Sequence, residues 1–232
     1  MAEFLSSLSL FPLVLTFGAY QFALWLQKKG KSPVLNPILV ASLLVIAFLL
    51  VTGISNDTFQ AGSKPLTWLL TPATVCLALP LYKQVQTLKK SLPAILVGIS
   101  AGTVVSLLFI FGLCLLFRLD RAMTVSLLPK SITTAMGMVL AENAGGYGSL
   151  TAAAIIITGI QGSLMGTMLC KLIRITDPVA QGVAFGTASH VVGTSRATEL
   201  GQLQGAVSSL SLAVAGILTA VVFPLVLMLV GG

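Results

Sequence analysis

Long apolar runs divide this chain, and they constrain its fold more than any other feature of the sequence. A helix needs about 20 apolar residues to cross a bilayer, and several runs reach that length. The clearest runs are Phe4–Leu26, Val34–Thr52, Pro93–Phe117, Ser149–Cys170 and Ala206–Val230. Only 8% of the residues are charged, whereas a soluble domain carries about 25%. The pattern predicts an all-α, polytopic membrane protein, a single domain over residues 1–232 with about six to eight transmembrane segments.

The net charge of +7 comes mostly from short hydrophilic gaps between the apolar runs. The two main groups are Lys28, Lys29 and Lys31, and Lys83, Lys89 and Lys90. Short basic loops lie on the cytoplasmic side of a membrane protein. We therefore expect these loops to face the cytoplasm and the apolar runs to contact the lipid bilayer, and we expect no nucleic-acid partner.

The residues that usually carry catalysis or metal binding are sparse. The three cysteines, Cys76, Cys114 and Cys170, each lie inside an apolar run and are predicted to be small core residues. A single histidine, His190, excludes a zinc site built from two histidines. Ser189 is its neighbour, so the two side chains diverge on a helix and form a poor nucleophile–base pair. We expect no enzyme, no cofactor and no metal ion.

More polar segments, broken by proline, glycine or serine, alternate with the apolar runs. They are Leu66–Tyr82, Ala122–Ala141 and Val179–Glu199. The polar stretch Gly53–Lys64 is predicted to be a loop. Irregular backbone at membrane depth is tolerated only where it is buried in protein or lines a cavity. We therefore expect broken or re-entrant helices around a small-solute site.

The runs and the breaks recur at a spacing of roughly 58 residues, which indicates an internal repeat. A shift of half the chain lays Val34–Phe117 over Ser149–Gly232 without a gap. The halves would cover about residues 1–117 and 118–232. The alternative is a chance register between runs of similar length. The halves are parallel if every segment crosses the membrane, and inverted if one broken segment of the first half is re-entrant. Matching breaks in two halves indicate a transporter site.

A lysine and three hydroxyl residues cluster in the second broken segment. Lys130 follows Pro129 and precedes Ser131, Thr133 and Thr134. Proline suits the first turn of a helix, where free N–H groups favour an anion. Lys130 would add positive charge there, and the hydroxyls would donate hydrogen bonds to a carboxylate. The alternative is a lysine that extends to the membrane interface.

The third broken segment holds further candidates for substrate binding. His190 titrates near physiological pH in peptides, so it either couples a proton or contacts substrate, or it is a neutral histidine hydrogen-bonded inside the bundle. Arg196 and Glu199 lie three residues apart on one helix face. Arg196 would either receive a carboxylate or only pair with Glu199. Ser189, and Thr74 from the matching break of the first half, complete the predicted substrate-binding set.

Two glycine pairs, Gly98 with Gly102 and Gly162 with Gly166, show the small-xxx-small spacing that lets helices approach closely in lipid. The alternative is ordinary glycine usage in membrane helices.

Two motifs resemble the LrgB/CidB family: Pro129-Lys130-Ser131-Ile132-Thr133-Thr134, and the stretch from Gly186 to Glu199. The resemblance implies a multi-pass bacterial membrane protein, holin-like or antiholin-like, that modulates murein hydrolase activity and cell lysis. It also implies a smaller membrane partner of the LrgA/CidA type, and transport of small carboxylates such as pyruvate or glycolate in some relatives. Departures from the usual family residues occur at Ala135, Gln181, Val191 and Ser195.

Together, the residues and the resemblance predict a transporter, or transporter subunit, for small monocarboxylates that acts with an LrgA/CidA-type partner. Self-association is left open. The alternative is an antiholin-like regulator of murein hydrolase activity and cell lysis.

Overall fold

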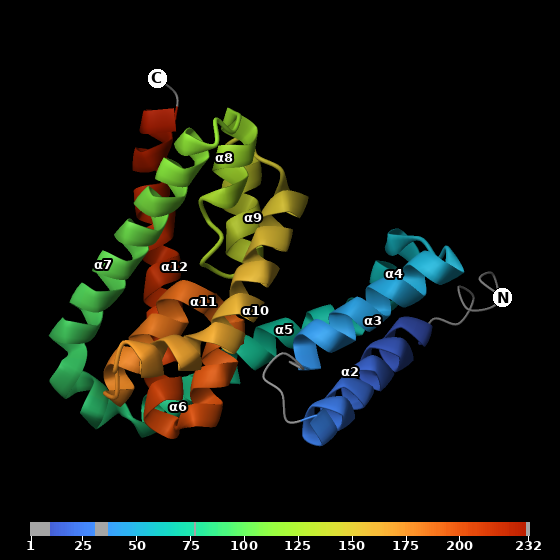
Figure 1. The fold of residues 1–232 in the computed structure, drawn as a ribbon, viewed down its shortest axis with the longest axis horizontal. Coiled ribbons are helices and arrows are strands. Elements are labelled where there is room, and N and C mark those ends of the chain that lie inside the picture. The colour runs from blue at the N-terminus through green and yellow to red at the C-terminus, as the bar shows by residue number, and fades with distance from the viewer. Residues whose placement is uncertain (1–9, 31–36, 77, 231–232) are drawn as a thin grey trace. The chain divides into compact units, whose positions relative to one another are not determined.

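The computed structural model describes residues 10–30, 37–76 and 78–230, and every regular element in these ranges is an α-helix. The chain divides into two compact units, Met1–Cys76 and Leu77–Gly232 (Figure 1). The predicted all-α class is confirmed. The predicted internal repeat stays a prediction.

Within its described residues, the first unit contains four helices: α2 (Phe11–Gly30), α3 (Pro37–Thr52), α4 (Asn56–Gly62) and α5 (Lys64–Cys76). Alanines at the contact of α2 with α3 let the two helices pack around Ala19, Ala23 and Ala41. The starts of the first two predicted runs, residues 4–9 and 34–36, lie outside the described residues.

The predicted loop between residues 53 and 64 is wrong in part, because it contains α4. Ser55 starts this helix by accepting a hydrogen bond from the Thr58 backbone N–H at 3.3 Å. The following helix α5 continues through Pro72, where the sequence predicted a break. Cys76, at its end, is exposed and is not the core residue that was predicted, whereas Cys114 and Cys170 are buried.

The second unit contains the remaining helices: α6 (Ala78–Lys83), α7 (Val85–Leu116), α8 (Arg121–Leu127), α9 (Thr134–Asn143), α10 (Gly148–Leu172), α11 (Pro178–Leu200) and α12 (Gln202–Val230). By length and composition, α7, α10 and α12 are apolar enough to cross a membrane. These three helices match three of the predicted apolar runs and supply the frame of this unit.

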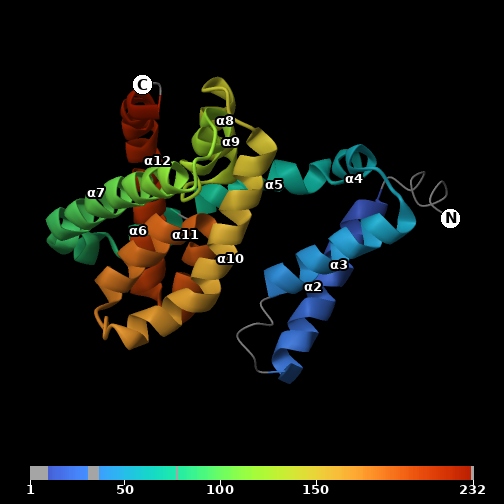
Figure 2. The same ribbon diagram turned by 45° about the horizontal axis from the view of Figure 1, so that its top comes forward.

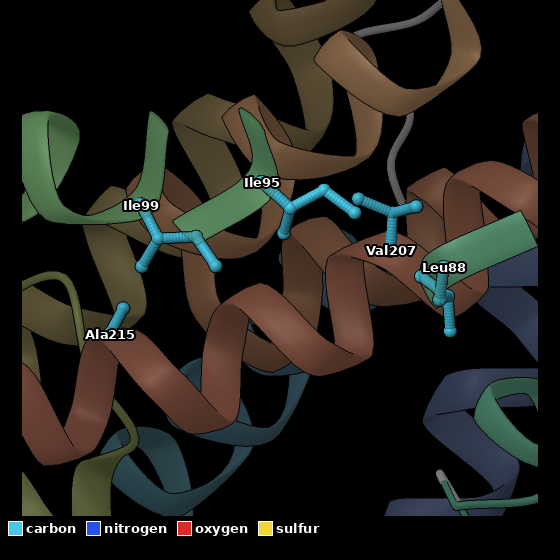
Figure 3. Packing of buried hydrophobic residues seen from close by; sticks show 5 residues of the cluster. All are labelled: Leu88, Ile95, Ile99, Val207 and Ala215. Carbon is cyan, nitrogen blue, oxygen red and sulfur yellow. The ribbon is translucent and has the colours of Figure 1, made fainter. Parts of the chain in front are cut away.

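The core of the second unit lies between α7 and α12. Figure 3 shows Ile95 and Ile99 of α7 pointing toward Val207 and Ala215 of α12. The two isoleucines are four residues apart and so share one face of α7. Helix α11 packs against α12, α10 and α7 (Figures 1 and 2).

Two short helices, α8 and α9, form a hairpin beside the first turns of α10 (Figure 2). Asp120 begins α8 by accepting the Met123 backbone N–H at 2.7 Å. Pro129 follows the end of α8, because proline lacks the N–H that would extend the helix. Helix α9 begins at Thr134, so the prediction that Pro129 starts a helix is wrong.

The hairpin is tied to α10 at its open end. Ser126 of α8 accepts the Tyr147 backbone N–H at 2.7 Å, and the Thr151 hydroxyl donates to the Ser126 carbonyl at 2.9 Å. With 7 and 10 residues, α8 and α9 are each too short to cross a bilayer. The hairpin therefore has the form of a re-entrant segment with Lys130 in its turn.

Helix α11 is interrupted at Ser189 and His190. Ser189 has φ −132° and ψ 16°, and His190 has φ 43° and ψ −136°, so two helical halves, 178–188 and 191–200, meet at these residues. The predicted break in this segment is confirmed.

Candidate functional site

Two cavities lie on either side of the first half of α11. The α7-side cavity, about 540 Å³, lies between α7, the hairpin turn and α11. The α10-side cavity, about 430 Å³, lies between α10, α11 and the same turn. Lys130, Ala184 and Ala188 line both cavities. The hairpin turn and the break of α11 thus come together in one region of the second unit.

The Lys130 ammonium group is the positive charge shared by the two cavities. Its side chain is half-buried, and Nζ donates a hydrogen bond to the Ser131 hydroxyl at 3.4 Å. Ser131 and Ser106 of α7 share a hydrogen bond of 3.1 Å. An ammonium has three donors, and within the described residues no carboxylate forms an ion pair with this one. Lys130 can therefore donate to an anion in either cavity.

The depth of Lys130 follows from its neighbours on α10. The carbonyl of the preceding Pro129 and the side chain of Ile155 in α10 both lie within 3.3 Å of the Cβ position of Gly137. The α10-side cavity that Lys130 lines extends along α10 from Thr158, near the middle of that helix. A charged group near the middle of a spanning helix is costly and in membrane proteins usually marks a solute pathway.

Glycines on both neighbouring helices bring α11 close to α7 and α10. A Cβ added at any of these glycines would meet an α11 side chain. The pairs are Gly98 with Val183 (3.3 Å), Gly102 with Thr187 (3.0 Å), Gly162 with the Ser189 hydroxyl, and Gly166 with Phe185 (2.5 Å). The first half of α11 therefore lies between two pairs of glycines, Gly98 and Gly102 on α7 and Gly162 and Gly166 on α10, which we call the glycine tracks. These are the two pairs noted in the sequence, and they allow close packing.

Ser189 is buried, with 3% of its surface exposed, and lines the α10-side cavity with Lys130. No hydrogen bond to its hydroxyl is found among the described residues. The hydroxyl packs on Gly162 and is available to a solute in the cavity.

His190 is buried and bonded inside the bundle. Its Nε2 lies 2.7 Å from the Ile155 carbonyl oxygen of α10. Because a carbonyl only accepts, Nε2 carries the hydrogen. Thr194 donates to the His190 carbonyl at 2.9 Å and also contacts the Ser208 hydroxyl of α12 at 2.9 Å. Hydrogen bonds to α10 and α12 thus hold the break of α11 in place. This position of His190 matches the alternative of a neutral histidine that is hydrogen-bonded inside the bundle.

The other predicted site residues lie elsewhere. Arg196 and Glu199 form an ion pair of 2.7 Å, with side chains 37% and 65% exposed, and line neither cavity. Thr133 precedes α9, and Thr134 begins it. Thr74 lies in α5 of the first unit. The structure brings together Lys130, Ser131 and Ser189.

Some residues that line the cavities were not predicted from the sequence. Ser106 lies four residues beyond Gly102, so it continues the small-residue face of α7, and this spacing was the signal that identifies it. Asp177 also lines the α7-side cavity, where its carboxylate accepts the Ala180 backbone N–H at 2.8 Å and caps α11. Thr187 lies in the stretch from Gly186 to Glu199 but was not chosen as a site residue, and nothing in the sequence distinguishes Thr103 from other threonines in apolar helices.

Comparison with known proteins finds one family over nearly the whole chain. The model of the LrgB-like family matches residues 16–229. The chain is 35% identical over 221 residues to the holin-like protein CidB of Staphylococcus aureus (strain Mu50), covering 95% of this chain and 96% of the relative. It is 34% identical over 223 residues to the antiholin-like protein LrgB of Bacillus subtilis (strain 168), covering 96% of each. No solved structure matches.

Proposed function

The chain belongs to the LrgB-like family of bacterial membrane proteins, and we propose that it modulates murein hydrolase activity and cell lysis as a holin-like or antiholin-like protein. The proposal is supported by two relatives, one named holin-like and the other antiholin-like, each of which this chain matches over 96% of the relative's length. The helices α7, α10 and α12 provide the membrane-spanning frame that such a protein needs. This function makes the chain a membrane regulator rather than an enzyme.

A deletion strain tests this proposal. We expect autolysis in buffer with detergent, followed by turbidity, to differ from that of the parent strain and to return with a plasmid copy. Faster lysis in the deletion strain identifies an antiholin-like direction, and slower lysis a holin-like direction. Identical lysis curves and identical murein hydrolase zymograms contradict the proposal.

A second candidate function, carriage of a small monocarboxylate such as pyruvate or glycolate, is favoured by one observation. Lys130 is half-buried at two cavities, its ammonium group donates to the Ser131 hydroxyl, and Thr187 and Ser189 are among the residues that line these cavities. An ammonium and hydroxyls attract a carboxylate, and charge-assisted hydrogen bonds are the stronger kind. Cavities of about 540 and 430 Å³ are large enough for such a solute. A smaller LrgA/CidA-type membrane protein would be its partner.

The shared lining of the two cavities gives this candidate a mechanism. Lys130 faces both cavities, and between them stand the small side chains of Ala184 and Ala188. A carboxylate held by Lys130 would pass from one cavity to the other through a small shift of the first half of α11. The glycine tracks leave few side chains to obstruct such a shift.

Uptake of radiolabelled pyruvate and glycolate into proteoliposomes, with and without the partner protein, tests the second candidate. We expect Lys130→Ala to reduce the rate at least about tenfold, the loss of one charge-assisted hydrogen bond. Lys89→Ala is the matched control, because it removes an exposed lysine that lines neither cavity. Equal uptake by the Lys130 variant and the unaltered protein contradicts this candidate and leaves the lysis proposal standing.

A further inference from the structure

A small chamber lies next to the α7-side cavity. Its volume of about 10 Å³ is close to the space that a single water molecule needs. It shares Ser106, Ser131 and Thr187 with the larger cavity, and Thr103 and Thr219 supply two more hydroxyl groups. Five hydroxyl residues from α7, the hairpin turn, α11 and α12 therefore surround a space that holds one oxygen atom.

Two of these hydroxyls have no hydrogen-bond partner. Thr103 is 4% exposed and Thr187 is 7% exposed, and the Oγ1 atom of each is buried and unpaired within the described part of the chain. Threonines in helices commonly donate to the carbonyl four residues earlier, as Thr198 does to Thr194 at 2.9 Å. Buried hydroxyls without a partner are rare because they are costly. Two of them at one chamber therefore indicate a polar ligand that accepts hydrogen bonds.

The neighbouring charge indicates the sign of that ligand. Lys130 Nζ donates to the Ser131 hydroxyl oxygen at 3.4 Å, so the Ser131 hydrogen is free to point to Ser106 or into the chamber. A positive charge near the chamber disfavours a cation and favours an oxygen that carries negative charge. The remaining wall, with Leu107 and Ala215, offers no charged group.

We propose that this chamber is an oxyanion subsite that takes one carboxylate oxygen, while the rest of the solute stays beside Lys130 in the α7-side cavity. The Thr103 and Thr187 hydroxyls donate to that oxygen. A water molecule takes the same place between turnovers. This inference rests on the proposed carboxylate function and assigns the residues that would select for a carboxylate over a neutral solute of the same size.

Binding of radiolabelled pyruvate to the purified full-length protein in detergent, followed by scintillation proximity, tests the subsite. Thr103→Val and Thr187→Val keep the shape of the side chain and remove the donor. We expect each to weaken binding about tenfold or more. Thr167→Val is the matched control, because its hydroxyl is also buried and unpaired but lines none of these cavities. Thr103→Ser keeps the hydroxyl, and we expect its affinity for pyruvate to lie within about threefold of that of the unaltered protein.

Each result decides between the proposals. Wild-type affinity in both valine variants, together with loss of binding in Lys130→Ala, overturns the subsite and keeps the carboxylate function. No pyruvate or glycolate binding by the unaltered protein overturns both. The unaltered protein could also require sodium for pyruvate binding while the valine variants bind without it. That result places a cation in the chamber and overturns the subsite. Gel filtration of every variant separates a binding defect from misfolding, and Thr103→Ser reports on the hydroxyl where a valine variant misfolds.

Discussion

The backbone of His190 is strained, and its side chain holds two helices together. Its φ of 43° and ψ of −136° lie in a region that residues with a side chain rarely adopt. The imidazole donates to the Ile155 carbonyl at 2.7 Å, and Gly159 leaves the ring room, since a Cβ there would lie 2.5 Å from Cε1. The hydrogen bond and the packing thus hold a conformation that the backbone alone disfavours.

This arrangement predicts an order of stability for two variants. His190→Ala loses the hydrogen bond to the Ile155 carbonyl and the packing of the ring, and it keeps the backbone strain, so we expect a loss of about 1–3 kcal/mol. His190→Gly loses the same bond but relieves strain of about 1–3 kcal/mol, so it should be the more stable of the two. Thermal unfolding of the purified proteins, followed by circular dichroism, measures both. A melting temperature for the alanine variant equal to or above that of the glycine variant contradicts the prediction.

At the scale of the element, the contact between α10 and α11 depends on a missing side chain. A Cβ at Gly162 would occupy the position of the Ser189 hydroxyl. In α7, by contrast, nothing lies within 4 Å of the Cβ position of Gly112. Two glycines in long apolar helices therefore have opposite packing requirements.

Alanine substitutions at these two glycines test the glycine track. We expect Gly162→Ala to destabilise the protein by about 1–3 kcal/mol, because α10 and α11 must separate or Ser189 must leave its place. Gly112→Ala should be neutral or stabilise by up to about 1 kcal/mol, since alanine is the better helix former. Urea unfolding in detergent compares them. A Gly162 variant as stable as the Gly112 variant would show that the two helices are not in close contact.

The sequence predicted some elements well and others poorly, for physical reasons. Long apolar runs predicted α7, α10 and α12, because length and hydropathy are local properties. The break of α11 was predicted because its glycines and serine weaken a helix locally. The start of α9 was not predicted, because proline occurs both at the start of a helix and just after the end of one. Asp120 starts a short helix α8 before Pro129, so Pro129 follows that helix and α9 begins only at Thr134.

Some residues of the site could likewise be predicted from the sequence, and others could not. Lys130 and Ser189 were predicted, because polar groups inside apolar sequence are conspicuous. Arg196 was as conspicuous, but only the three-dimensional arrangement separates its exposed ion pair from the cavities. Its predicted role in substrate binding stays a prediction. Thr103 and Thr187 were not chosen from the sequence, because the chamber that they both line exists only where α7 and α11 are in contact.

At the scale of the whole molecule, the short hairpin of α8 and α9 sets the topology of the second unit. If this hairpin enters and leaves the membrane on one side, then α7 and α10 cross in opposite directions. Lys89 and Lys90, in the first turns of α7, and Lys171, in the last turn of α10, then lie on the same side. The positive-inside rule places them in the cytoplasm. A hairpin that crossed the membrane would instead put Lys171 outside, against that rule.

Labelling of single cysteines from one side of the membrane tests this topology. In a variant with Cys76, Cys114 and Cys170 replaced by serine or alanine, cysteines are placed at Lys90, Tyr147 and Arg174, which are all exposed. We expect a membrane-impermeant maleimide to label Tyr147→Cys in intact cells, because Tyr147 lies at the open end of the hairpin. Lys90→Cys and Arg174→Cys should react only after permeabilisation, and full labelling of all three then serves as the control. Labelling of Tyr147→Cys and Arg174→Cys from the same side would mean that the chain crosses an even number of times between them, so that α10 does not span the bilayer as a single helix and Lys130 does not lie at its mid-depth.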